Sequence, residues 1–96
     1  MRLTIIPLDN LVIKDGEGYN VDNLDYLDSN INAIQWYEDK GEVEYLDGTE
    51  NLEITDITPY NQCLTDWNTA KTQYEEDIKE KTLTDSDFEK MFRHNR

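Results

Sequence analysis

Alternation of apolar and polar residues dominates the first 57 residues and predicts short β-strands separated by turns. The apolar, β-branched segments 2–7 and 11–14 flank a turn, and Asp15-Gly16 with Gly18 then marks a tight turn typical of a β-hairpin. Further alternation predicts strands over 31–37, 42–46 and 52–54, with Lys40-Gly41 between two of them as a loop signal. We therefore expect a small antiparallel β-meander of four to five strands.

Within the 31–37 segment, alternation places Ile34 and Trp36 on one face. The other face would carry Ile31 and Ala33 with either Gln35 or Tyr37. If Ile34 and Trp36 face the core, Tyr37 is exposed beside acidic residues. The segment 20–29 stays ambiguous, because three of its apolar residues have helical spacing that suits either a short helix or a turn.

The period changes to three and four residues after Thr58, which predicts helices. Thr58 is a suitable N-cap and Pro59 suits the first helical position. The recurring residues of an amphipathic helix of about five turns are Tyr60, Cys63, Leu64, Trp67, Ala70, Tyr74 and Ile78. Thr82-Leu83-Thr84 is expected to end this helix and to begin a short terminal helix, in which Phe88, Met91 and Phe92 share a face.

These patterns predict one α+β domain over residues 1–96, with the long C-terminal amphipathic helix packed on the sheet. The β-rich half, 1–57, contains 14 acidic and 3 basic residues, whereas the helical half, 58–96, contains 8 and 6. The net charge of −13 argues against direct binding of nucleic acid phosphates and against anionic membranes. We find no signal-peptide pattern and no apolar run near the ~20 residues of a membrane span, and therefore expect a cytoplasmic location.

Candidate catalytic and metal-binding chemistry is sparse. Cys63 is the only cysteine, which excludes an internal disulfide, and its place in the helical repeat predicts a buried core residue. His94 is the only histidine, so a histidine-based zinc site or catalytic base is not expected. The register from Asp28 to Asp39 resembles a calcium loop but has Ala33 where such a loop needs glycine. We expect no enzyme activity, no cofactor and no metal.

Protein binding is the function that these residues favour. Tyrosine and tryptophan are enriched at interfaces, and a short meander leaves an open edge that could also pair with a second copy of the chain. The candidate contact residues are Trp36, Tyr37, Glu42, Glu44 and Tyr45. Two alternatives stay open: Trp36 could pack in the core against Trp67, and the acidic sheet could imitate duplex phosphates to inhibit a basic protein. A merely solubilising acidic surface is the simpler explanation of the charge.

Three segments carry a family resemblance: Leu3-Thr4-Ile5-Ile6-Pro7 through Lys14-Asp15-Gly16 and Tyr19; residues 31–37 with 41–45; and residues 51–54 followed by Pro59-Tyr60 and Trp67. Over residues 3–70 the chain resembles small uncharacterised proteins of tailed bacteriophages, often encoded near tail-fibre genes. The resemblance implies a virion-associated or tail-assembly role with other phage proteins as partners, in the host cytoplasm or in the virion. The alternative is an acidic inhibitor of a host restriction, CRISPR or DNA-binding protein. No catalytic motif comes with the family.

Overall fold

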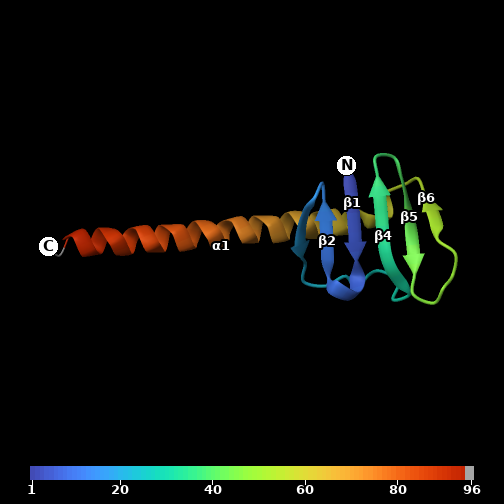
Figure 1. Ribbon diagram of the computed structural model, residues 1–96, viewed down its shortest axis with the longest axis horizontal. Helices are drawn as coiled ribbons and strands as arrows, with labels where there is room; N and C mark the ends of the chain where they lie inside the picture. Colours follow the sequence, from blue (N-terminus) through green and yellow to red (C-terminus); the bar gives the residue numbers. More distant parts are fainter. Residues whose placement is uncertain (95–96) are drawn as a thin grey trace.

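Six antiparallel strands form one sheet, and a long helix packs across one of its faces (Figure 1). The computed structural model describes the backbone of residues 1–94 and the side chains of residues 1–78. The strands are β1 (Arg2–Ile6), β2 (Leu11–Lys14), β3 (Glu17–Asn20), β4 (Ile31–Tyr37), β5 (Lys40–Tyr45) and β6 (Leu52–Ile54), in the spatial order β3-β2-β1-β4-β5-β6. The helices are α1 (Asn61–His94) and the short 3₁₀ helices η1 (Pro7–Asp9) and η2 (Thr58–Tyr60). The predicted α+β class is confirmed.

The sheet has six strands rather than four to five, because the Asp15-Gly16 turn continues into β3. Asp15 and Gly16 have φ angles of 50° and 84°, which is the pattern of a type I′ hairpin turn, and Lys14 pairs with Glu17 across it. The sequence of β3 contains a glycine and only one apolar side chain, Tyr19, so alternation could not reveal it. β3 pairs with β2 because the Asp15-Gly16 turn reverses the chain. The hairpin predicted at this turn therefore includes a strand that alternation did not predict.

A bulge in β4 changes which residues face the core. The pairing with β5 shifts between Ile31 and Ala33, so that Asn32 is an extra residue on β4. Ile31 pairs with Tyr45 and Ile34 with Val43, which places Ile31 on the same face as Ile34 rather than with Ala33. Alternation without a bulge predicts the wrong face for Ile31.

Gly41 lies inside β5 and not in a loop. It pairs with Trp36 of β4, and a Cβ at this position would overlap the carbonyl oxygen of Gln35 and lie 3.0 Å from the Trp36 ring. The glycine is therefore required by the close approach of the β4 backbone, chiefly the Gln35 carbonyl, and of the Trp36 indole. The turn itself consists of Glu38 and Asp39, and Glu38 has a φ of 60°.

The core lies between the sheet and the first turns of α1. Fully or nearly fully buried side chains from the sheet, from the loop after β3 and from α1 form one cluster: Leu3, Ile5, Val12, Val21, Leu24, Ile31, Ile34, Trp36, Val43, Cys63 and Trp67. The segment 20–29 contributes Val21 and Leu24 as an irregular turn, without a helix. Both tryptophans belong to this cluster, which confirms the core position of Trp36 and the buried position of Cys63, although the aromatic ring that packs against Trp67 is Tyr19 of β3.

The helix α1 is continuous from Asn61 to His94, where the sequence predicted two helices. No proline or glycine occurs in this range, and threonine costs only about 0.5 kcal/mol relative to alanine, so Thr82-Leu83-Thr84 does not end it. Thr58 begins η2 instead of capping α1, and its N–H is bound by the Asp56 carboxylate at 2.9 Å. The predicted common face of Phe88, Met91 and Phe92 lies outside the described side chains.

The helix extends beyond the sheet on the β3 side (Figure 1). Cys63 and Trp67 are buried under the sheet, whereas Tyr74 and Ile78 on the same helical stripe are 53% and 48% exposed. The Cα trace measures 69 × 25 × 17 Å as a result. Over the described residues, no helix combines the length and the apolar character that crossing a membrane requires.

Candidate functional site

In the part of the chain that the structure describes, no helix covers the face of the sheet opposite α1 (Figure 1), and the strand registers place most of the predicted contact residues on this face. Gln35 pairs with Glu42, Glu42 pairs with Glu53, and Tyr37 pairs with Lys40. We define the outer face by the residues that share this side of β1, β4, β5 and β6: Arg2, Thr4, Gln35, Tyr37, Lys40, Glu42, Glu44 and Glu53. All eight line a shallow hollow of about 670 Å³.

Of the five predicted contact residues, the structure brings together Tyr37, Glu42 and Glu44. Tyr37 is 63% exposed, Glu42 is exposed and Glu44 is partly buried. Trp36 is only 5% exposed and belongs to the core, and Tyr45 packs against the core from the opposite face. Since β4 lies between β1 and β5, its contribution to a contact surface is through this face and not through a strand edge.

Carboxylates concentrate on the β5–β6 side of the outer face. Glu42 and Glu53 are directly opposite each other on neighbouring strands, an arrangement of like charges that is destabilising. Side-chain amides partly offset this repulsion, because Asn51 donates to Glu42 at 3.2 Å and Gln35 donates to Glu44 at 3.3 Å. The amides also hold the carboxylates in place, with the remaining lone pairs open to a donor from a partner.

Aliphatic side chains continue the same side of the sheet toward β2. Ile6, Leu11 and Ile13 are partly buried there, and Thr4 pairs with Ile13 between them and the charged region. The uncovered side of the sheet therefore has an aliphatic part and an acidic part, with Arg2 and Lys40 adding positive charge. Protein interfaces commonly combine an apolar core with a polar rim, and this side of the sheet offers both kinds of surface.

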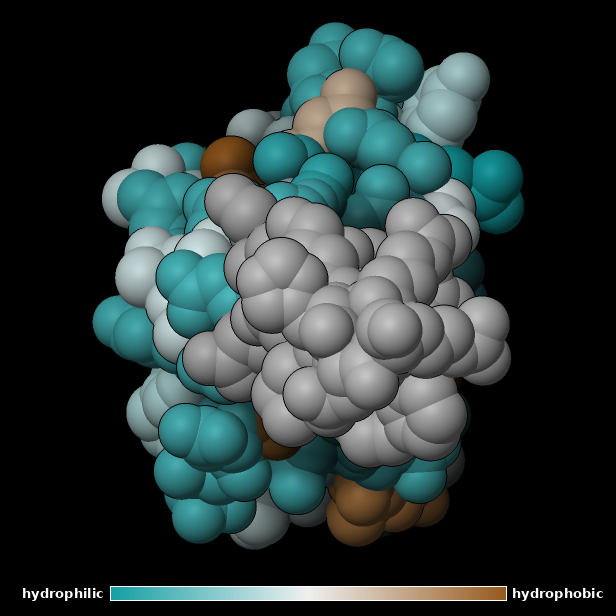
Figure 2. Space-filling model, turned by 90° about the vertical axis from the view of Figure 1, so that its left-hand side faces the viewer, coloured by the Kyte–Doolittle hydropathy of each residue, from teal (hydrophilic) through white to brown (hydrophobic). Residues whose placement is uncertain are grey.

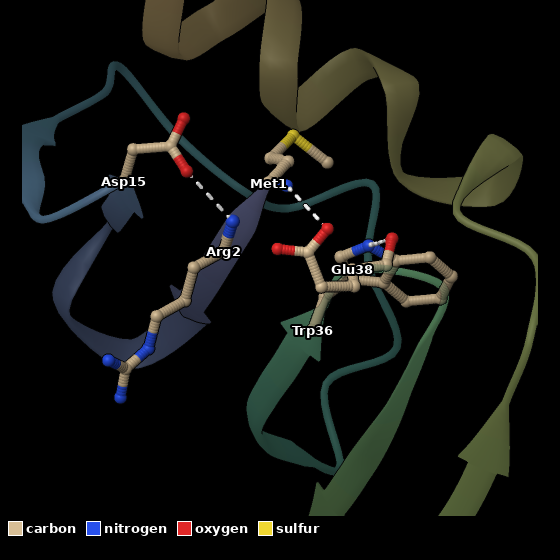
Figure 3. A network of polar contacts seen from close by, with 5 residues as sticks. All are labelled: Met1, Arg2, Asp15, Trp36 and Glu38. Atoms are coloured by element: carbon tan, nitrogen blue, oxygen red, sulfur yellow. Dashed lines mark hydrogen bonds and ion pairs between the residues drawn. The ribbon is translucent and has the colours of Figure 1, made fainter.

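A hydrogen-bonded network holds the end of the sheet that carries the β4–β5 turn (Figure 3). The amino group of Met1 lies 3.6 Å from the Glu38 carboxylate, and the Glu38 N–H donates to the Met1 carbonyl at 2.9 Å. The Trp36 indole N–H donates to the Glu38 carbonyl at 3.1 Å. On the other side of β1, the Arg2 N–H donates to the Asp15 carboxylate at 2.9 Å. These contacts fix both neighbouring turns and so position the exposed aromatic residue at the end of β4.

A second polar cluster, which the sequence did not indicate, joins β3 to α1. The Trp67 indole N–H donates to the Glu17 carbonyl at 2.8 Å, and the ammonium groups of Lys14 and Lys71 lie 4.8 and 5.1 Å from its ring centre. Tyr19 donates to the Glu17 carboxylate at 2.6 Å, and Lys71 lies 3.3 Å from it. These two contacts lower the pKa of Glu17, and the bond to Glu17 raises the pKa of Tyr19 to about 12. Only β3, which alternation missed, brings these groups together.

Tyr26 and Cys63 meet near the start of α1. The Tyr26 hydroxyl donates to the Asp66 carboxylate at 2.7 Å and lies 3.4 Å from the Cys63 sulfur. Burial raises the pKa of Tyr26, and burial likewise raises the pKa of the Cys63 thiol, which is fully enclosed. A thiol of this kind is a poor nucleophile, because the reactive form is the thiolate.

Within residues 1–78, no three His, Cys, Asp or Glu side chains come together in a way that could hold a metal ion. Comparison of the chain with protein-family models, with curated proteins and with solved structures finds no match in any of the three.

Proposed function

We propose that this chain is a small non-enzymatic bacteriophage protein that acts by protein–protein binding, as a virion or tail component or as a tail-assembly factor. The resemblance of residues 3–70 to small proteins of tailed phages supports the biological setting. The uncovered outer face supports the mode of action, with other phage proteins as partners.

The outer face carries this proposal because its composition is not explained by stability. Tyr37 is 63% exposed at the end of β4, directly opposite the cations Arg2 of β1 and Lys40 of β5. The pairing of Glu42 with Glu53 lowers the stability of the sheet. A lysine in place of either glutamate would be as well solvated and would remove the repulsion, so solubility alone does not explain the pair. Tyrosine is one of the residues in which the binding energy of protein interfaces is concentrated.

One observation favours the alternative, an acidic mimic that inhibits a basic host protein. Glu42 and Glu44 are two residues apart on β5, which separates side chains on one face by roughly 6.5–7 Å, and Glu53 extends the row onto β6. Against it, Arg2 and Lys40 lie on the same face and interrupt the array. The outer face therefore favours binding to phage proteins over mimicry of nucleic acid.

The test is complementation of a phage from which the gene has been deleted. A tail role predicts the protein in purified virions by mass spectrometry or a tail defect in the deletion. Tyr37→Ala should reproduce that defect, because it removes the exposed aromatic ring of the face. The control is the pair Glu75→Gln and Glu76→Gln, which neutralises two exposed glutamates on α1 away from the outer face.

Absence from virions together with normal tails would overturn the tail role. The mimic predicts a different result, namely binding to a basic host protein that weakens strongly with added salt. That binding should fall when Glu42 and Glu44 are changed to glutamine, whereas Tyr37→Ala should matter little. Unchanged binding after both glutamate substitutions excludes mimicry through this face.

A further inference from the structure

We propose that the free edge of β3, together with the projecting part of α1, binds an extended basic segment of a partner protein as a seventh strand. This inference goes beyond the proposed function, because it concerns a different surface, on the helix side of the sheet. The edge of β3 and α1 enclose a groove of about 730 Å³. Residues Gly18 to Asn23 form one wall, and α1 from Gln62 to Asp77 forms the other.

The backbone of β3 is available for strand addition. β3 is the first strand in the sheet order, and within residues 1–94 it pairs only with β2. Lys14 and Glu17 flank the two-residue turn as a hydrogen-bonded pair, and pairs then alternate along an antiparallel ladder. Gly18 and Asn20 consequently direct their N–H and C=O groups away from β2, and both residues line the groove. Four residues of β3 offer roughly 14 Å of edge.

Beyond this edge, α1 offers exposed aromatic and aliphatic side chains to an added strand. The Tyr74 ring packs against Tyr19 at 5.5 Å between ring centres and a 53° tilt, so the aromatic surface of β3 continues onto α1. Tyr74 and Ile78 are about half exposed although they continue the stripe that buries Cys63 and Trp67. An added strand would cover Tyr74 with its inward side chains. Addition of an extended segment to an exposed edge, with side-chain pockets giving specificity, is a recurring mode of peptide recognition.

Charge identifies the occupant as basic. Asp22, Asp66 and Asp77 line the groove, and no lysine or arginine is among its described lining residues. The Tyr26 hydroxyl and the Gln62 amide, at 2.7 and 2.9 Å, each donate to one oxygen of Asp66 and hold it in place. Tyrosine faces beside carboxylates favour arginine or lysine. Cation–aromatic contact is already used next to the groove, where Lys14 and Lys71 flank Trp67. A second copy, with a net charge of −13, would repel this edge.

The probe is the acetylated and amidated peptide Thr-Arg-Val-Arg-Val-Arg-Thr, titrated into the full-length ¹⁵N-labelled protein. Strand addition predicts slow amide exchange at Gly18 and Asn20 in the complex, together with chemical-shift changes at Tyr74. A peptide with glutamine in place of arginine should bind about tenfold more weakly, because hydrogen bonds to charged groups are lost. A peptide with N-methylated valines should not protect Gly18 or Asn20, since the methyl groups remove the peptide's donors and keep its carbonyls from approaching the N–H groups of β3.

Protein variants localise the effect. Tyr74→Ala should weaken binding about tenfold, and Asp66→Asn should weaken it by a similar factor through loss of a charged acceptor. Gly18→Pro removes an outward N–H and should abolish protection, and the N-methylated peptide makes the same test without altering the protein. Tyr37→Ala and Glu53→Gln, the matched changes on the outer face, should leave peptide affinity unchanged.

Three results would overturn the proposal. The first is equal binding of the N-methylated peptide, and the second is a set of shift changes centred on the outer face. The third is protection of Gly18 and Asn20 in the free protein that depends on protein concentration, which would assign this edge to a second copy. Failure here leaves the outer-face proposal intact, because Tyr37→Ala reports on that surface alone.

Discussion

The two faces of the sheet are built on the same strands but obey different constraints. Facing α1, neighbouring strands place Ile5, Ile34 and Val43 side by side, each with at most 1% of its surface exposed. On the outer face, the adjacent positions hold Gln35 and Glu42. Buried apolar side chains stabilise the fold in proportion to the area removed from water, whereas the outer side chains contribute little. The inner face therefore specifies the fold, and the outer face is free to carry a function.

The side of the molecule seen along α1 is mostly polar. Figure 2 views the molecule from the side on which α1 projects, and hydrophilic residues cover most of the visible surface beside the helix, with a few separate hydrophobic patches. No polar or charged side chain in the described range is classed as buried. Tyr37 and Tyr74 are two of the exposed aromatic side chains, and each lies at one of the two proposed binding surfaces.

The largest effect is expected from a pair of neighbouring substitutions that separates the two faces. Ile34→Ala should lower the free energy of unfolding by about 3–4 kcal/mol, because it leaves a cavity at a fully buried position. Gln35→Ala, the next residue along the same strand, should change it by less than about 0.5 kcal/mol. Urea unfolding followed by circular dichroism measures both. Comparable losses for the two variants would contradict the division into a structural and a functional face.

Gly41→Ala tests the contact between a glycine of β5 and the inner-face indole. The added methyl group has no room between the Gln35 carbonyl and the Trp36 ring, so we expect a loss of about 2–3 kcal/mol from overpacking. Gly48→Ala is the control, because nothing lies within 4 Å of its Cβ position and only its φ of 84° opposes the change. Thermal unfolding of both variants should show the larger decrease for Gly41→Ala. An equal decrease would mean that the close approach is unimportant.

Glu53→Gln should act on the outer face in the opposite direction. Removing one of two glutamates that face each other should stabilise the protein by roughly 0.2–1 kcal/mol. Glu50→Gln removes the same charge from an exposed loop position and should give a smaller change. If Glu53→Gln also weakens partner binding, the like-charge pair is retained for function at the expense of stability. Destabilisation by Glu53→Gln would show that the pair is structural.

The smallest effect concerns pH at the junction of β3 and α1. Bonds from Tyr19 and Lys71 lower the pKa of Glu17 below its ordinary value of 4.5. A lowered pKa in the folded state means that these contacts stabilise the fold above the unfolded pKa, and that this stability is lost as the pH falls through the folded pKa. The melting temperature of the parent protein should therefore exceed that of Glu17→Gln near neutral pH, and the difference should shrink at acidic pH. A difference that does not depend on pH would exclude ionisation as the cause.

The elements that the sequence predicted correctly are those whose signal is local. The hairpin at Asp15-Gly16 follows from a turn that needs two positive φ angles, and β4 follows from alternating Ile34 and Trp36. The exposure of Tyr37 follows from the same alternation. The long amphipathic helix follows from apolar residues at three- and four-residue spacing, up to Ile78. Each of these depends on neighbouring residues, and pattern alone is sufficient.

The candidate sites could be predicted from local sequence patterns only in part. Tyr37, Glu42 and Glu44 were predicted as contact residues and lie together, but the opposition of Glu42 and Glu53 depends on the register of two strands. The groove beside β3 was missed, because β3 itself has one apolar side chain and no alternation. Its partner surface on α1 is distant in the sequence, so no local pattern connects the two.

The amino-acid sequence by itself was therefore enough to establish an acidic α+β chain, its main strands, the helical repeat and the burial of Cys63, because periodicity and turn chemistry act over a few residues. Only the tertiary structure decided the bulge at Asn32, the need for glycine at position 41, the continuity of α1 and the surroundings of Trp67. These depend on close contacts and registers between strands and helix that are remote in the chain. The same long-range geometry creates the uncovered outer face and the groove at β3, the two surfaces on which the proposed binding rests.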